Sequence, residues 1–407
     1  MIIFFTLGDM KTSQQKHPFL QRLVTFFLRS IIYIHYHYRA KDKYKIAKGE
    51  SVVVLANHQT DIDPLLIYLS FNKTLYTVAT DNIFRKGLVS SFLKRMGCIP
   101  KKKGVVDLKS NIEMMRVVSR GDSLLFFPEG NRSYAEFQYY ITPAIGKYLK
   151  AFKSTIILFN IHGGTGVFPR FAKKKRKGPF YGQIKKVLKY EDYADIPNEE
   201  LTQIIKDNLR VIDSESKQLY KSKASAEYLE RLFFLCPVCM TPHKLVSKGH
   251  YLRCQNCGLE VEYKPDLTLA SNHPHFTYTK LLPWYNLQKR WIKDLPIKDD
   301  EIIFTDGPVT LKNANPEEER KIIAKGQMSV TNHYLSFPNI SFPIEDIMIA
   351  SPVSGIKLCF TIKDKSYQVI GHKRFNPLKY VFLFNKLNTL MNQKQIDNYF
   401  QIQEDDK

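Results

Sequence analysis

The segment Ser51-Val-Val-Val-Leu-Ala-Asn-His-Gln-Thr-Asp-Ile-Asp-Pro64 decides the fold class of this chain. Its first six residues form a largely apolar run, which is typical of a strand buried on both faces of an α/β sheet. The polar residues that follow end this strand, and Asp63-Pro64 then opens an apolar helix. A buried strand that passes through a polar loop into a helix predicts an α/β layer fold.

The alternation of strands and helices continues beyond this segment. Four further strands are expected at 75–79, 97–100, 123–127 and 155–161, with helices at 92–96 and 110–118. A long polar helix over 198–223 is expected to end the domain. We therefore predict that residues 46–223 form one α/β domain, a mixed sheet covered by helices.

Composition limits the classes of function. The chain has 407 residues, with 61 Lys and Arg against 39 Asp and Glu, a formal net charge of +22. This length predicts two or three domains, and the 44% hydrophobic content excludes a disordered or fibrous chain. The charge requires an anionic partner, which could be nucleic acid, an anionic membrane surface or a phosphorylated small substrate.

The N-terminal residues 1–45 are expected to form an amphipathic, membrane-facing segment. A run of about 20 uncharged apolar residues is not found, and no signal peptide is recognisable, so we expect the chain on the cytoplasmic side of a membrane. Within 19–34 the apolar residues recur at helical spacing, opposite Arg22 and Arg29. Two arginines favour a helix that lies in the bilayer interface. The alternative is a helix packed on the domain core.

A run of five cations at 173–177 is the most basic stretch of the chain. Its proposed contact is anionic lipid, at about 1 kcal/mol per residue near the surface. A solvated loop and a nucleic-acid patch are the alternatives.

His58 and Asp63 form the first candidate site. His58 follows the buried strand, at the end where α/β sheets place ligands, and Asp63 stands five positions later. Asp63 can hold one ring N–H, which leaves the other ring nitrogen able to take a proton from a hydroxyl nucleophile. The alternatives are that Asp63 only caps the helix, that His58 is structural, and that Asp61 orients the ring instead.

A second polar turn follows another predicted buried strand. Residues 124–127 are apolar, and the turn after Pro128 contains Glu129, Gly130 and Arg132. Glycine lets the backbone approach a ligand closely, and the planar guanidinium fork suits a phosphate. The alternative is a solvated turn with a surface ion pair.

Four of the six cysteines form two CxxC pairs. Their spacing, with 14 residues between the pairs, is close to the pattern of a zinc site with four thiolate ligands. We predict a structural zinc ribbon over 236–263, with the alternative that the turns have lost their metal. The four expected ligands are Cys236, Cys239, Cys254 and Cys257.

The remaining residues, 296–400, are rich in predicted strands and end in a predicted helix over 376–392. Turn residues separate the strands, one of which is expected over 328–337. This pattern predicts a small barrel-like domain similar to the pleckstrin-homology type.

The two polar turns together resemble motifs of the glycerolipid acyltransferases, a family that includes 1-acylglycerol-3-phosphate acyltransferase. The family's block Asn-His-x4-Asp is matched by Asn57, His58 and Asp63, and its block Phe-Pro-Glu-Gly-Thr-Arg-Ser by 127–133 with Asn131 in place of Thr. A further block is matched loosely at 97–100, with Lys103 where Arg is usual, and a fourth would fall at 156–161. The resemblance covers roughly residues 30–215.

The resemblance implies transfer of an acyl chain from a thioester to the free hydroxyl of a lysophospholipid. The donor would be acyl-CoA or acyl carrier protein, and 1-acylglycerol-3-phosphate would give phosphatidic acid. His58 would be the general base and Asp63 would orient it, with no catalytic cofactor. The implied substrate-binding residues are Asn57, Lys103, Glu129, Gly130 and Arg132, of which Lys103 and Arg132 would bind the acceptor phosphate. The protein would act as a peripheral or monotopic membrane protein.

Two functions from other classes remain as alternatives. A nucleic-acid-binding zinc-ribbon protein would use the net charge, but it leaves the two acyltransferase blocks unexplained. A catalytically silent membrane scaffold would not need His58, Asp63 and Glu129. We therefore expect an acyltransferase whose partners are an acyl donor, a lysophospholipid and an anionic membrane, and no nucleic acid.

Overall fold

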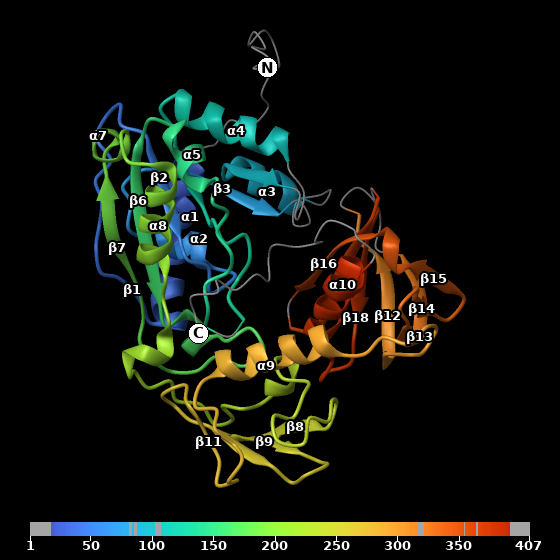
Figure 1. Cartoon of the computed structure of the whole chain (residues 1–407). Coiled ribbons are helices and arrows are strands. Elements are labelled where there is room, and N and C mark those ends of the chain that lie inside the picture. Colours follow the sequence, from blue (N-terminus) through green and yellow to red (C-terminus); the bar gives the residue numbers. More distant parts are fainter. Residues whose placement is uncertain are drawn as a thin grey trace.

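The computed structural model describes residues 18–80, 84, 88–101, 107–134, 136–315, 321–353, 355–363 and 365–390. These residues form an α/β layer, a small four-stranded module and a seven-stranded antiparallel domain (Figure 1). The α/β fold class and the strand-rich C-terminal region predicted from the sequence are therefore confirmed.

The α/β layer is built on a mixed sheet of seven strands. All neighbouring strands are parallel except β6 and β7, which pair antiparallel. Across the sheet the order is β1 (Tyr38–Ala40), β7 (Phe180–Leu188), β6 (Thr155–His162), β2 (Val52–Ala56), β5 (Ser123–Phe126), β3 (Leu75–Thr80) and β4 (Cys98–Lys101). Because β2 lies between β5 and β6 and is parallel to both, the carboxyl ends of these three strands meet at one edge.

Strand β2 is buried on both faces, as its apolar run predicts. Val53 and Leu55 pack into one core, whereas Val52, Val54 and Ala56 pack into the other. The first core is closed by α4 (Leu108–Ser119), α5 (Ile145–Lys150) and α8 (Asn198–Leu209). The second core includes side chains of α1 (Pro18–Tyr36), α2 (Asp63–Tyr68) and α6 (Gly164–Val167). Two short helices, α3 (Leu88–Arg95) and α7 (Tyr190–Tyr193), complete the layer.

The prediction of one helix over 198–223 is wrong, because α8 ends at Leu209. The chain instead enters a short 3-10 turn at Asp213–Ser216. Asp213 is buried there and accepts hydrogen bonds from the Gly163 N–H, at 2.7 Å, and from the Thr165 hydroxyl. Tertiary bonding of one carboxylate to the β6–α6 turn thus outweighs the helical propensity of this polar stretch.

The cysteine region forms a small antiparallel sheet that is tied to a long helix. Its strands are β8 (Leu245–Lys248), β9 (Tyr251–Cys254), β10 (Glu260–Tyr263) and β11 (Leu269–Ala270). Helix α9 (Leu281–Asp294) follows the sheet and runs toward the C-terminal domain (Figure 1). On α9, Trp284 Nε1 donates to Leu235 O at 2.9 Å, and Gln288 Oε1 accepts from the Phe234 N–H at 2.6 Å. The helix thereby anchors the segment that leads into Cys236.

The described residues of the C-terminal domain form seven strands followed by one helix, the strand-rich pattern with a terminal helix that the sequence predicts. Across its sheet the order is β15 (Ile340–Pro343), β14 (Tyr334–Phe337), β13 (Ile322–Val330), β12 (Phe304–Asn313), β18 (Lys365–Ile370), β17 (Lys357–Ile362) and β16 (Ile347–Val353). Helix α10 (Leu378–Leu390) packs against β16 and α9. The single strand predicted over 328–337 is instead split between β13 and β14 by a turn.

Candidate active site

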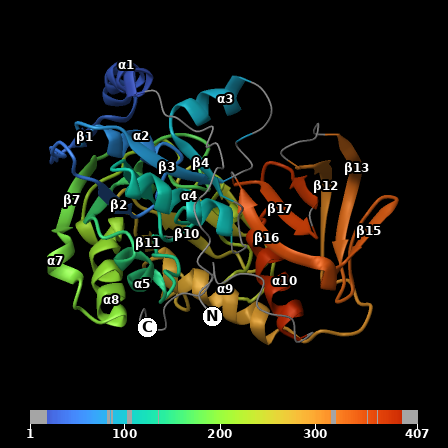
Figure 2. The ribbon, with the colours of Figure 1, turned by 90° about the horizontal axis from the view of Figure 1, so that it is seen from above.

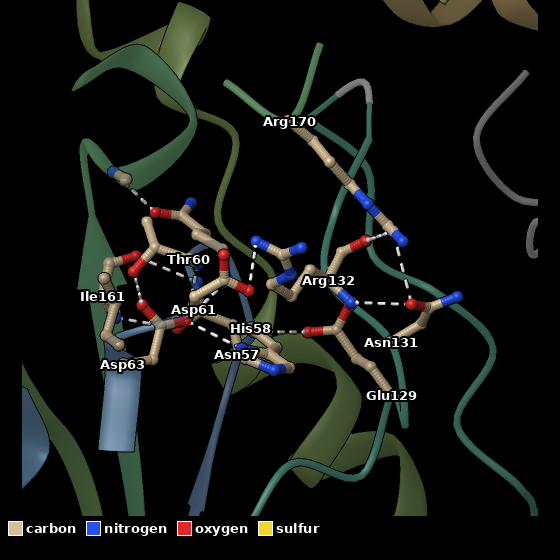
Figure 3. A network of polar contacts seen from close by, with 12 residues as sticks. Asn57, His58, Thr60, Asp61, Asp63, Glu129, Asn131, Arg132, Ile161 and Arg170 are labelled. Atoms are coloured by element: carbon tan, nitrogen blue, oxygen red, sulfur yellow. Dashed lines mark hydrogen bonds and ion pairs between the residues drawn. The ribbon is translucent and has the colours of Figure 1, made fainter. Parts of the chain in front are cut away.

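The candidate site begins where β2 ends (Figure 3). His58 Nδ1 lies 2.8 Å from Asp63 Oδ2. The Asp63 side chain is fully buried, whereas His58 keeps 19% of its side-chain surface exposed. The His58 ring stacks on Phe127, just after β5, with centroids 4.1 Å apart. The imidazole is therefore held from two strand ends, with Nδ1 engaged and Nε2 placed to accept a proton.

The Asp63 carboxylate is fixed by the loop that precedes it. Its Oδ2 accepts from the backbone N–H groups of Gln59, at 2.6 Å, and Thr60, at 2.9 Å, and the Thr60 hydroxyl donates to Oδ1. The N-cap of α2 is Ile62, so the Asp63 side chain orients His58 instead of capping the helix. Sequence reasoning missed the contribution of Gln59 and Thr60. Two of these three donors are backbone N–H groups, which carry no residue-type signal, and only the Thr60 hydroxyl depends on the residue type.

Two amide side chains clamp this loop, one onto the neighbouring strand β6 and the other onto the start of α6. Asn57 Nδ2 donates to Ile161 O at 2.9 Å, and the Ile161 N–H donates to Asn57 Oδ1 at 2.7 Å. Gln59 Oε1 accepts from the Gly164 N–H at 2.8 Å, and a Cβ on Gly164 would lie only 2.6 Å from that oxygen. The structure thus places Asn57, the implied substrate ligand, in a buried position where its amide binds the backbone of β6.

Glu129 joins the two predicted motifs. Its Oε1 accepts from the His58 N–H at 3.2 Å and its Oε2 from the Tyr139 N–H at 2.9 Å. The Ser133 N–H donates to His58 O at 2.8 Å, which adds a second link between the loops. Burial raises the pKa of Glu129 to about 8, and the charge of Asp63 adds to that rise, whereas the two backbone donors oppose it. The two motifs therefore border one site, as their resemblance to acyltransferase blocks requires.

Arg132 is paired with Asp61 across this site (Figure 3). Arg132 Nη1 lies 2.6 Å from Asp61 Oδ1, and the side chains are 14% and 65% exposed, respectively. Burial and the neighbouring Arg170 lower the pKa of Arg132, and Asp61 opposes the change. Asp61 therefore neutralises the arginine, while the His58 ring is oriented by Asp63.

A small pocket that opens to solvent, with a cavity volume of about 10 Å³, lies beside the two loops. Its lining residues are Asn57, His58, Gln59, Glu129, Ser133, Phe137, Gln138, Leu209 and Val211. His58 lines this pocket and keeps 19% of its side-chain surface exposed.

Two predicted site residues remain, Gly130 and Lys103, and the structure describes only the first. Gly130 has φ 63° and donates its N–H to Phe127 O at 3.0 Å, a left-handed turn that favours glycine. Lys103 lies outside the described residues.

The four predicted metal ligands converge on one point. Ligand atoms of Cys236, Cys239, Cys254 and Cys257 all lie within 4.8 Å of one another. The Cys236–Cys257 and Cys239–Cys254 sulfur distances are 3.6 and 3.7 Å. Four thiolates about 2.3 Å from a zinc ion form a tetrahedron with sulfur–sulfur distances of about 3.8 Å. The cluster therefore fits a metal ion held by four cysteines.

The basic run at 173–177 is not uniformly solvated. Arg176 is buried, donates to Ser225 O at 2.6 Å and lies 4.7 Å from the centre of the Tyr263 ring. Lys175 lies over the Tyr36 ring at 3.4 Å. One member of the run thus anchors the cysteine module to the α/β layer, which leaves the exposed lysines as candidates for lipid contact.

Part of the chain is similar to a known enzyme family. Residues 37–169 match the family model Acyltransferase. That stretch, about a third of the chain, contains His58, Asp63, Glu129 and Arg132, so both polar loops lie in the part of the chain that is similar to this family. Among solved structures, the 1-acyl-sn-glycerophosphate (LPA) acyltransferase PlsC from Thermotoga maritima matches with 14% identity and a TM-score of 0.36, over 47% of this chain and 93% of that chain. No curated protein matches the chain.

Proposed function

We propose that the protein transfers an acyl chain from the thioester of acyl-CoA or acyl carrier protein to the free hydroxyl of a lysophospholipid such as 1-acylglycerol-3-phosphate. The observation that carries this proposal is the arrangement of the His58–Asp63 pair and Arg132 around one site. A base for a hydroxyl and a cation for a phosphate are the two groups that such an acceptor needs.

The proposed reaction is a direct transfer. His58 Nε2 takes the proton of the acceptor hydroxyl while Asp63 holds Nδ1–H and stabilises the imidazolium. The hydroxyl oxygen attacks the thioester carbonyl, a C–O bond forms and the C–S bond breaks. The imidazolium then returns its proton to the leaving thiolate, so His58 ends each cycle in its starting state.

Arg132 is proposed to bind the acceptor phosphate. Its planar guanidinium can donate two parallel hydrogen bonds to phosphate oxygens, which fixes the distance between phosphate and hydroxyl. In the structure Asp61 takes this place beside the arginine. The phosphate therefore has to displace the Asp61 carboxylate from Arg132 or bind the guanidinium beside it.

We further propose that the protein binds a membrane surface through α1. Three apolar side chains of this helix are largely exposed, Phe26 at 72%, Phe27 at 60% and Ile34 at 66%. The helix lies at the rim of the α/β layer, away from the C-terminal strands (Figure 2). Among the described helices none combines the length and apolar character needed to cross a bilayer. An amphipathic helix with such a face binds in the plane of the membrane interface.

The metal in the cysteine cluster is proposed to be zinc. Four thiolates complete a tetrahedral shell, so the ion would be structural and would leave no position for substrate. The proposal is supported by the sulfur–sulfur distances and by the two short loops that carry the cysteines.

A transfer assay with a matched histidine pair tests the proposed function. Purified full-length protein is mixed with labelled acyl-CoA and 1-acylglycerol-3-phosphate, and phosphatidic acid is measured. His58→Ala is expected to lower turnover by about 10²–10⁴, the usual contribution of a general base. The control is His333→Ala, since His333 lies 2.7 Å from Asp299 in an exposed pair on the C-terminal domain. Full turnover in the His58 variant would exclude the assigned base, and DNA binding without transfer would favour the nucleic-acid alternative.

A further inference from the structure

Arg170 lies just beyond the matched acyltransferase stretch, and its side chain reaches back to the loop that carries Arg132. Arg170 Nη1 donates to Arg132 O at 2.9 Å and to Asn131 Oδ1 at 3.3 Å (Figure 3). Asn131 Oδ1 also accepts from the Arg132 N–H at 3.1 Å. The two polar groups of the Arg132 backbone are therefore fixed by Asn131 and Arg170 together.

The same guanidinium also contacts the C-terminal domain. Arg170 Nη2 donates to the carbonyl oxygen of Pro352 on β16. The guanidinium carbon lies 4.1 Å from the centre of the Tyr134 ring, which adds a cation–π contact two residues after Arg132. A Cβ on Gly355 would lie 3.3 Å from Arg170 O, so the turn after β16 comes close to the backbone of Arg170.

We propose that Arg170 is a positioning residue for the acceptor site, and that it makes the position of Arg132 depend on the docked strand β16. The inference rests on the proposed role of Arg132 in binding the acceptor phosphate. A guanidinium presents five donors in a rigid plane, so one side chain can bind two carbonyl oxygens and an amide oxygen at once. Without the Arg170 guanidinium, the Arg132 backbone loses a hydrogen bond that fixes its position. The side chain proposed to bind the phosphate then starts from a less fixed backbone.

A purely structural role in domain docking is the competing explanation, and Arg231 provides the matched control. Arg231 Nε and Nη2 donate to Lys373 O at 2.9 and 2.7 Å, and Nη1 donates to Phe171 O at 2.9 Å. Its guanidinium carbon lies 3.9 Å from the centre of the Tyr228 ring. Arg231 therefore joins the same two parts of the chain by the same kinds of contact, but through residues outside the Arg132 loop.

The first test compares Arg170→Gln with Arg231→Gln in the full chain. Arg170→Gln is expected to raise KM for 1-acylglycerol-3-phosphate about tenfold, the factor that corresponds to 1.4 kcal/mol. KM for acyl-CoA and kcat should change far less. Arg231→Gln should lower the thermal midpoint to a similar extent and leave the acceptor KM within twofold. Arg170→Lys, which keeps the charge over Tyr134 but loses the fork, should give an intermediate acceptor KM.

Two further measurements make the result decisive. Asn131→Leu removes the amide oxygen, so it should raise the acceptor KM, and its combination with Arg170→Gln should be no worse than either single variant, as expected for one coupled unit. Hydrogen exchange of the peptide that covers residues 129–134 should rise in Arg170→Gln and not in Arg231→Gln.

The outcomes separate this inference from the proposed function. If the wild-type protein transfers no acyl chain, the proposed function fails, and the exchange comparison alone decides whether Arg170 holds the loop. If the wild type is active and both arginine variants change the acceptor KM equally, Arg170 only docks the domains and the inference is overturned. An unchanged acceptor KM in Arg170→Gln, or unchanged exchange over 129–134, would overturn it as well.

Discussion

Two regions of the molecule bring a carboxylate and a histidine together. They differ in whether the histidine lies beside a pocket or within a group of side chains that joins domains. In the candidate active site, Asp63 holds His58 while the ring keeps 19% of the side chain exposed beside a pocket. In the second region, which we call the Asp306 cluster (Asp306, Lys379, Tyr380, His243 and His372), the polar atoms bind one another at a domain junction. Asp306 Oδ2 lies 2.5 Å from Lys379 Nζ and accepts from the Tyr380 hydroxyl at 2.6 Å.

The centre of the Asp306 cluster is buried, whereas His372 at its edge keeps 38% of its side-chain surface exposed. Lys379 is 1% exposed, and its Nζ lies 3.0 Å from His243 Nδ1, so the lysine links α10 to the cysteine module. Burial, with the charge of Lys379, lowers the pKa of His243 to about 4. Under the proposed function, His58 is the histidine whose free ring nitrogen meets the substrate, whereas the Asp306 cluster links α10 to the cysteine module and to β12.

Metal removal should have the largest effect. It should act on the cysteine module, which His243 joins to the Asp306 cluster, and not on the candidate active site. Structural zinc contributes about 10–16 kcal/mol of apparent binding energy in zinc-finger peptides, so a chelator is expected to unfold the cysteine module. Both tryptophans of the chain, Trp284 and Trp291, lie on α9 beside this module, and Trp284 stacks on Phe233 with ring centroids 4.0 Å apart. We expect chelation to release zinc and to shift tryptophan fluorescence.

Cys239→Ser should reproduce the effect of chelation, and Cys359→Ser is its control because Cys359 lies on β17 outside the four-thiol cluster. Metal release without any change in fluorescence or in protection of residues 236–263 would contradict a structural role for the ion.

Removing the charge of Asp63 should have the next largest effect, and here the comparison predicts a loss of chemistry without a loss of fold. In Asp63→Asn the amide oxygen can keep the N–H donors of Gln59 and Thr60, and the amide N–H₂ can donate to the Thr60 hydroxyl. What disappears is the charge that stabilises the imidazolium. Turnover should fall by about 10²–10⁴ while the thermal midpoint stays within a few degrees of the wild type. Equal loss of turnover and of folded protein would show that Asp63 supports folding, as Asp306 is expected to do, and would contradict its proposed role in the reaction.

Removing the charge of Asp306 should produce the opposite pattern. Asp306→Asn leaves Lys379 buried without its carboxylate, which is expected to cost about 3–5 kcal/mol of unfolding free energy. Denaturant unfolding measures this cost, and transfer activity per folded molecule should remain close to that of the wild type. Asp299→Asn, in an exposed pair with His333, is the matched control and should leave the denaturant midpoint nearly unchanged.

How far each region can be predicted from sequence follows from the separation of its residues along the chain. His58 and Asp63 are five positions apart, and each CxxC pair lies within one turn, so spacing alone indicates these partners. His243 and Lys379 are 136 positions apart, and Tyr380 is 74 positions from Asp306. Only the docking of three parts of the chain brings these groups together, and no local pattern reports it.

The errors in the fold have the same origin. The polar stretch after α8 has a helical composition, but the helix ends at Leu209, and the Asp213 carboxylate binds the β6–α6 turn instead. Arg176 belongs to a basic run that predicts a solvated or lipid-facing surface, yet it is buried against Tyr263. In both places a long-range contact outweighs a local preference, whereas the strands of the α/β layer follow their apolar runs because burial on both faces is a local signal.

The smallest expected effect concerns Asp61, the exposed partner of Arg132. Asp61→Asn removes a negative charge from the proposed phosphate site and leaves the arginine fork available, so KM for 1-acylglycerol-3-phosphate should fall, with kcat unchanged. The expected change is about 1.4- to fivefold, because an ion pair with an exposed partner contributes about 0.2–1 kcal/mol. It should shrink at high salt, which screens exposed charges but not the buried Asp306 pair. A rise in the acceptor KM would instead show that Asp61 holds Arg132 in its binding position, and the candidate active site would then resemble the Asp306 cluster more than the structure suggests.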